Sequence, residues 1–95
     1  MDYPSISISN INIRFLPSPK GNLLAFVSVI LNGAIVLSNI GVHIHRNGDL
    51  GVSFPARTRP DGSREYYYAP LNEDVRKLIE SAIAKKYLSL TGGGD

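Results

Sequence analysis

The chain contains no cysteine, which excludes a disulfide framework, thiolate metal sites and a cysteine nucleophile. It also lacks a long apolar run. The longest extends from Leu23 to Leu31 and includes Ser28, whereas a membrane-spanning helix needs roughly 20 residues. The first five residues are acidic and polar, unlike a secretory signal peptide. These absences predict a soluble protein of the cytoplasm that has no membrane partner.

The chain also lacks a large excess of either positive or negative charge. Ten Lys and Arg residues stand against eight Asp and Glu residues, so the formal net charge is +2. This balance permits weak attraction to nucleic acid without requiring it. No glycine-rich phosphate-binding loop is present, and neither histidine has a catalytic partner placed by a known motif. We therefore expect no enzymatic activity, no cofactor and no small-molecule substrate.

The two histidines, His43 and His45, are two positions apart, which places both rings on one face of a strand. Two imidazoles can ligate zinc, but no other concentrated set of metal ligands accompanies them. We expect no metal site. A small enzyme or metalloprotein centred on this pair is the most remote of the functions considered.

The 95 residues, 43% of them hydrophobic, are enough for one small globular domain. We assign residues 1–91 to this domain and residues 92–95, which follow the last helical position, to a flexible tail. A chain this short has a thin stability margin, and oligomerisation is a common way to bury more surface. A homodimer is therefore expected.

Strand patterns fill the first two thirds of the chain. Alternating apolar residues between Ile6 and Phe15 slip by one near Asn10, which predicts a β-bulge. A turn is expected over 17–22, and the Asn32-Gly33 pair predicts a tight hairpin because both positions of a type I′ turn need positive φ. The remaining predicted strands are 23–31, 34–44 and 50–54, followed by a small hairpin over 57–68.

A helix follows the strands. Asn72 is a favourable N-cap, and the carboxylates of Glu73 and Asp74 suit the positive end of the helix dipole. One apolar stripe is expected at helical spacing, and the glycines at 92–94 end the helix. The predicted fold class is α+β: a small antiparallel sheet of about five strands with one C-terminal helix covering a face. The predicted stripe consists of Val75, Leu78, Ile79, Ala82, Ile83 and Leu90.

The most informative segment joins a cationic hairpin to the start of this helix. Arg57, Arg59 and Arg64 flank a Pro60-Asp61-Gly62 turn. We expect Arg57 and Arg59 to point to one face, with Arg64 joining them across the turn, where guanidinium groups can bind phosphates. The alternative is a solvated surface loop in which Asp61 and Glu65 neutralise the arginines.

The tyrosine triplet 66–68 also has two interpretations. Exposed rings beside cations could stack on unpaired bases. Alternatively, Tyr66 and Tyr68 on one face and Tyr67 on the other pack the hairpin against the sheet, which is the interpretation that we favour.

These motifs occur in a fixed order: Phe54-Pro55, a short basic stretch, the Pro60-Asp61-Gly62 turn, then Ala69-Pro70-Leu71-Asn72 at the helix start. In this order and spacing, the segment from about Ile11 to Leu88 resembles the stage V sporulation protein G family of bacteria, also called septation proteins. The resemblance implies a homodimer of small sheets with C-terminal helices. It also implies binding to DNA and RNA as a global regulator linked to septation and sporulation.

The resemblance places the expected nucleic-acid contacts on Arg57 and Arg59 in the loop and on Arg76 and Lys77 in the helix. Arg64 and Lys86 are expected as secondary contacts. The helix cations are also explained as an ordinary helix exterior, because Glu73–Lys77 and Arg76–Glu80 are favourable i,i+4 pairs.

The chain departs from the family pattern at three points. Ala69 stands where a histidine is common, the basic stretch reads Arg57-Thr58-Arg59, and Glu73-Asp74 replaces small hydroxyl residues at the helix start. The two carboxylates add negative charge beside Arg76 and Lys77. The alternative function, which the low net charge of +2 favours, is a homodimeric protein–protein adaptor in cell division or sporulation that does not bind nucleic acid.

Overall fold

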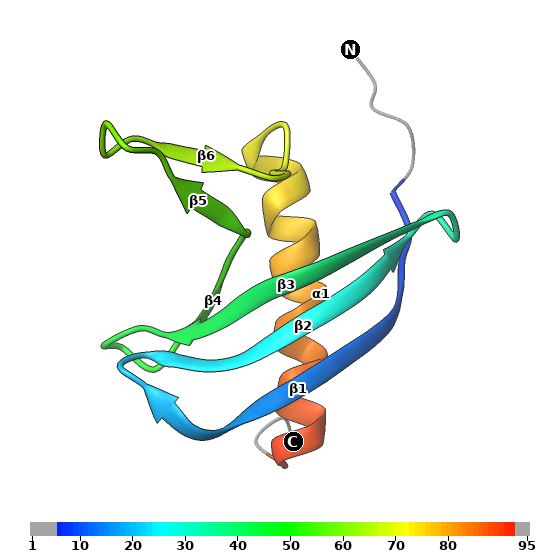
Figure 1. Cartoon of the computed structure of the whole chain (residues 1–95). Coiled ribbons are helices and arrows are strands. Elements are labelled where there is room, and N and C mark those ends of the chain that lie inside the picture. The colour runs from blue at the N-terminus through cyan, green and yellow to red at the C-terminus, as the bar shows by residue number, and fades with distance from the viewer. Residues whose placement is uncertain (1–5, 93–95) are drawn as a thin grey trace.

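The computed structural model describes residues 6–92, which form an α+β fold with two antiparallel sheets. A four-stranded sheet has the order β1-β2-β3-β4, and a separate two-stranded sheet pairs β5 with β6. The single helix within the described part, α1, crosses one face of the larger sheet, while the β5–β6 hairpin stands away from that sheet near the start of α1 (Figure 1). The elements are β1 (Ile8–Lys20), β2 (Leu23–Leu31), β3 (Ile35–Ile44), β4 (Leu50–Ser53), β5 (Ala56–Thr58), β6 (Arg64–Tyr66) and α1 (Glu73–Thr91). The predicted fold class is confirmed.

The core lies between α1 and one face of the larger sheet. Alternate residues of β2 point to this face and are buried, since side chains of a strand alternate between its two sides. Each buried aliphatic side chain contributes about 1.5–3 kcal/mol by leaving water. The buried hydrophobic residues are Ala25, Val27, Val29, Ile40, Val42, Val52, Phe54, Ile79 and Ile83.

Strand β1 contains the predicted irregularity. Asn10 has a φ of 50°, and the pairing with β2 shifts between Ser9 and Asn12. Asparagine tolerates this left-handed conformation better than most residues, so the predicted bulge is confirmed.

The turn predicted over 17–22 is shorter than expected. Strand β1 continues to Lys20, which pairs with Leu23, and only Gly21 and Asn22 form the turn. Pro17 and Pro19 are tolerated because β1 is the edge strand of the sheet and pairing is interrupted between Phe15 and Lys20.

The Asn32-Gly33 hairpin is confirmed. The two residues have φ values of 53° and 63°, and the Ala34 N–H donates to the Leu31 carbonyl at 2.9 Å. A further positive φ, 64° at Asn39, accompanies a register shift in β3 that the sequence pattern does not reveal. After this shift, Ile40 and Val42 face the core.

Helix α1 begins and ends as predicted. The Asn72 side chain accepts a hydrogen bond from the Val75 N–H at 3.0 Å, and Gly92 ends the helix with a φ of 78°. Within residues 6–92, no helix combines the length and the apolar character needed to cross a membrane. The rest of the predicted tail, residues 93–95, lies outside the described residues.

The predicted apolar stripe of α1 is wrong at two positions. Leu78 is 44% exposed and Leu90 is 52% exposed, whereas Ile79 and Ile83 are buried. Tyr87 completes the packed face, with its ring centroid 5.5 Å from that of Phe15. A helix that crosses a sheet packs along a narrow line, so apolar residues beside this line remain in contact with solvent.

Candidate nucleic-acid interface

The hairpin formed by β5 and β6 carries the cationic segment, and its turn is held by short-range hydrogen bonds. The Asp61 carboxylate accepts bonds from the Ser63 N–H at 2.9 Å and from the Ser63 hydroxyl at 2.7 Å. These bonds lower the pKa of Asp61. Gly62 supplies the positive φ of 89° that the turn requires. Asp61 therefore stabilises the turn, and in the described part of the chain it forms no ion pair with Arg57, Arg59 or Arg64.

Glu65 binds two of the predicted contact residues. Its carboxylate oxygens lie 2.6 Å from Arg57 Nε and 2.5 Å from a terminal nitrogen of Arg59. The bonds from Arg59 and then Arg57 lower the pKa of Glu65. Arg57 and Arg59 therefore lie on one face, as predicted, but share one carboxylate. Because exposed ion pairs are weak, a phosphate can replace Glu65 on either guanidinium.

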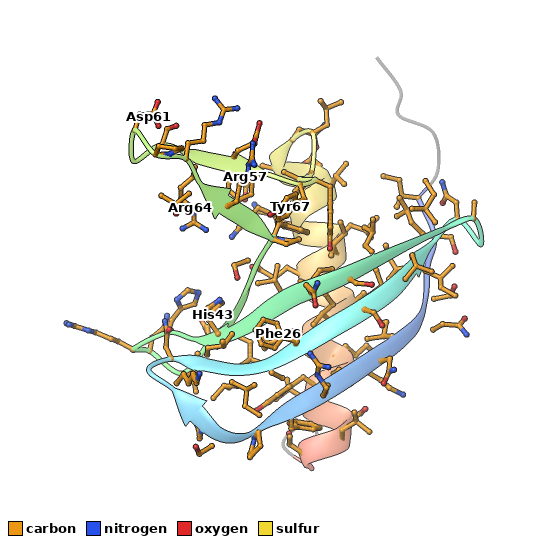
Figure 2. The ribbon with its side chains drawn as sticks, viewed as in Figure 1. Phe26, His43, Arg57, Asp61, Arg64 and Tyr67 are labelled. Atoms are coloured by element: carbon orange, nitrogen blue, oxygen red, sulfur yellow. The ribbon has the colours of Figure 1, made fainter. Side chains whose placement is uncertain are left out.

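Arg64 does not join these two arginines. The strand register pairs Arg57 with Glu65 and Thr58 with Arg64, and successive side chains of a strand point to opposite faces. Arg64 therefore lies on the other face of the hairpin (Figure 2), where its guanidinium carbon is 5.8 Å from the centroid of the Tyr66 ring. The expectation that Arg64 meets Arg57 and Arg59 across the turn is wrong.

This second face of the hairpin forms one wall of a cleft of about 470 Å³. Arg64 and Tyr66 line the cleft from β6, and Arg76 lines it from the first turns of α1. Ser53 lies at the end of β4, which carries the chain into the hairpin. The structure thus brings together one predicted cation from the hairpin and one from the helix.

Arg76 is held in place by several partners. Its guanidinium lies 3.4 Å from Glu73 and 3.8 Å from Glu80, and it donates to the Val52 carbonyl at 3.5 Å. Glu80 also accepts a bond from the Val52 N–H at 3.2 Å. The predicted Arg76–Glu80 pair is confirmed, and together these contacts connect α1 to β4 at the edge of the cleft.

The two lysines of the predicted interface lie outside the cleft. Glu73 pairs with Arg76 and not with Lys77, contrary to prediction, so within residues 6–92 Lys77 is exposed without an ion pair. Lys86 is nine positions further along α1, about 14 Å along the axis and half a turn around it. It lies near the C-terminal end of α1. This end of the helix is remote from the hairpin (Figure 1), so the structure does not bring Lys86 together with the others.

The three tyrosines have different environments. Tyr68 packs on Phe54 with ring centroids 6.0 Å apart, and its hydroxyl donates to the Ser38 carbonyl at 2.6 Å. Burial raises the pKa of Tyr68 to about 12. Tyr66 and Tyr67 are 54% and 68% exposed. The packing interpretation therefore holds for Tyr68 and is wrong for the other two, because the hairpin stands away from the larger sheet.

Comparison with known proteins identifies the family. The SpoVG family model matches residues 6–89, a range that includes all four strands of the larger sheet, the hairpin and most of the helix. The chain belongs to the SpoVG family.

Several curated relatives span the SpoVG domain almost completely, and each is named "Putative septation protein SpoVG". The chain is 34% identical to the protein of Acetivibrio thermocellus over 88 residues, which cover 93% of this chain and 92% of the relative. It is 33% identical to the protein of Thermoanaerobacter sp. over 82 residues, or 86% and 87% of the two chains. Identity to the protein of Caldicellulosiruptor saccharolyticus is 26% over 90 residues, covering 95% of this chain and all of the relative.

The histidines of this SpoVG domain lie on the face of the larger sheet opposite α1. His43 Nε2 lies 2.7 Å from the Ser53 hydroxyl, and Nδ1 lies 3.3 Å from the Asn22 side-chain oxygen. A neutral ring fits these partners, since Nδ1–H can donate to Asn22 while Nε2 accepts from Ser53. Among residues 6–92, no three potential metal-ligating side chains gather in one place.

Acidification is expected to destabilise the SpoVG domain through His43. Burial, and secondarily the charge of His45, lower the pKa of His43 below the unfolded value of about 6.5. At a pH below about 6.5, His43 of the unfolded chain binds a proton more readily than His43 of the folded chain. The free energy of unfolding therefore decreases as the pH is lowered from about 7 to about 5.

Urea unfolding at several pH values tests this expectation. The decrease should be clearly smaller in His43→Gln than in the wild type. His45→Gln removes only the secondary charge effect on His43, so it should reduce the decrease less than His43→Gln does. Measurements stay above about pH 5, where carboxylates with lowered pKa values remain ionised. An equal decrease in all three proteins would contradict the assignment to His43.

Proposed function

We propose that the protein is a nucleic-acid-binding regulator that acts in septation or sporulation in the cytoplasm. Its relatives are named septation proteins, which supports the biological setting. The observation that carries the binding proposal is the cleft in which Arg64 and Tyr66 of the hairpin lie opposite Arg76 of α1. Guanidinium groups bind phosphates in a forked geometry, and the ring offers a stacking surface.

The proposed contacts extend from the cleft to both neighbouring surfaces. Arg57 and Arg59 lie on the outer face of the hairpin and can exchange Glu65 for phosphate. Lys77 is exposed on the outside of α1. Lys86 is proposed only as a distant contact for a longer nucleic acid. This arrangement is suited to binding the phosphate backbone of DNA or RNA with little reading of base edges.

Fluorescence anisotropy with labelled DNA and RNA tests the proposal. At about 50 mM salt we expect micromolar dissociation constants, and at about 200 mM salt binding should be about 20- to 150-fold weaker, as three or four phosphate contacts imply. Absence of binding to every nucleic acid at low salt would contradict the proposal. The protein–protein adaptor would then be the better function.

We also propose that the protein is a homodimer, on the basis of an apolar groove of about 410 Å³. Leu31 and Leu37 line it from the β2–β3 hairpin, and Val75 lines it from α1; none of the described residues that line it is charged. Leu71 lies at the groove and is 84% exposed. In a twofold arrangement each Leu71 can fill the groove of the other copy, which makes the contact self-complementary.

Sedimentation velocity tests the dimer. Leu71→Asp places an unpaired charge in the apolar contact, so the dimer should dissociate about 100-fold more readily. Leu90→Asp, near the C-terminal end of the helix, is the matched control and should leave the dimer intact. A wild-type protein that remains monomeric at high micromolar concentration would contradict this proposal.

A further inference from the structure

We propose that the Arg64–Tyr66 wall of the cleft is a subsite for an unpaired base, so that the preferred partner is single-stranded nucleic acid. This inference rests on the proposed function and narrows its ligand class. Tyr66 presents a ring that is more than half exposed beside a cation at 5.8 Å. An exposed aromatic ring next to guanidinium groups is the arrangement on which unstacked bases bind.

The dimensions of the cleft favour a single nucleotide over a duplex. Its volume of about 470 Å³ lies in the range of small-molecule sites, roughly 300–1,000 Å³. A base within a duplex has both faces stacked on its neighbours, so it can contact Tyr66 only after leaving the stack, which costs free energy. A base in a single strand does not have to leave a paired stack.

The charges around the cleft favour a base over a phosphate beside Arg76. Glu73 lines the cleft and pairs with Arg76 at 3.4 Å. This carboxylate disfavours a phosphate beside Arg76 and tolerates a neutral base. Arg64, which has no ion pair among the described residues, is free to bind the phosphate of the same nucleotide. The expected pose therefore has the base on Tyr66 and its phosphate on Arg64.

Tyr67 provides a matched comparison because its ring is even more exposed than that of Tyr66. It does not line the cleft, and no arginine lies over its ring in the described part of the chain. If exposure alone made a tyrosine bind bases, both rings would contribute equally. The cleft predicts a contribution from Tyr66 only.

The test measures, by fluorescence anisotropy at low salt, the affinity for labelled single-stranded and double-stranded oligonucleotides of one sequence. The proteins are the wild type, Tyr66→Phe, Tyr66→Leu and Tyr67→Leu. We expect the wild type to prefer the single strand, and Tyr66→Leu to weaken single-strand binding by about 10-fold without changing duplex binding. Tyr66→Phe should retain the affinity because it keeps the aromatic face, and Tyr67→Leu should match the wild type.

Circular dichroism melting confirms that each variant is folded before its affinity is compared. Equal losses in Tyr66→Leu and Tyr67→Leu, or an unchanged single-strand affinity in Tyr66→Leu, would overturn the subsite. If binding is nevertheless salt-dependent, the proposed function stands and only the subsite is wrong. If no oligonucleotide binds to the wild type, both fail.

Discussion

Ile83→Ala is expected to lower the free energy of unfolding by about 3–4 kcal/mol. Ile83 is fully buried between α1 and the larger sheet, so truncation removes apolar contacts and leaves a cavity. For a domain of this length each kcal/mol shifts the melting temperature by about 4–8 °C, so a decrease of at least about 12 °C should appear. Urea unfolding measures the free energy and thermal unfolding measures the melting temperature, both followed by circular dichroism.

Leu90→Ala is the control for this prediction. Leu90 lies on the same helix, and the helical pattern of the sequence includes it in the apolar stripe, but it is half exposed. Its truncation should change the free energy of unfolding by no more than about 0.5 kcal/mol. Losses of similar size in the two variants would mean that α1 packs along the broader stripe and not along the Ile79–Ile83 line.

The contrast between these two residues shows where sequence patterns stop being informative. Helical spacing identifies all apolar residues on one side of α1, but the line of contact depends on how the helix crosses the sheet. Leu78 lies three positions after Val75 and four before Ala82, at helical spacing, and is nevertheless exposed. That crossing is a tertiary property, so no local pattern encodes it.

Features set by local backbone chemistry could be predicted well. The Asn32-Gly33 turn, the bulge at Asn10 and the cap at Asn72 each depend on what one or two residues do to neighbouring φ angles or N–H groups. The extension of β1 through Pro17 could not be predicted in the same way. Proline is tolerated there only because β1 is an edge strand, and the sheet order decides that.

The sequence predicts the arginines of the candidate site but not how they are arranged in space. The face of Arg64 depends on the register of the hairpin. One signal in the sequence indicates this register, since opposite charges at Arg57 and Glu65 favour their direct cross-strand pairing. The approach of Arg64 to Arg76 depends on how β4 leads into the hairpin. The exposure of Tyr66 follows from the same tertiary placement.

Arg64→Ala/Arg76→Ala is expected to weaken nucleic-acid binding by about 30- to 100-fold at low salt. The substitution removes the two guanidinium groups that line the cleft. The slope of log affinity against log salt should also become shallower by about 1, because Arg64 contributes one phosphate contact and about 0.7–0.9 counterions are released per contact. Anisotropy titrations across a salt series measure both effects. They are carried out well below the melting temperature of the variant, so that it remains folded.

Arg57→Ala/Arg59→Ala is the matched control, because it also removes two positive charges, here from the face of the hairpin that points away from the cleft. If binding depended only on net charge, the two variants would lose equal affinity. The cleft predicts a loss at least about fivefold smaller for the outer pair, since Arg57 and Arg59 do not line the cleft and their exposed bonds to Glu65 compete with phosphate. Equal losses would contradict the cleft as the binding centre and would favour a diffuse cationic surface.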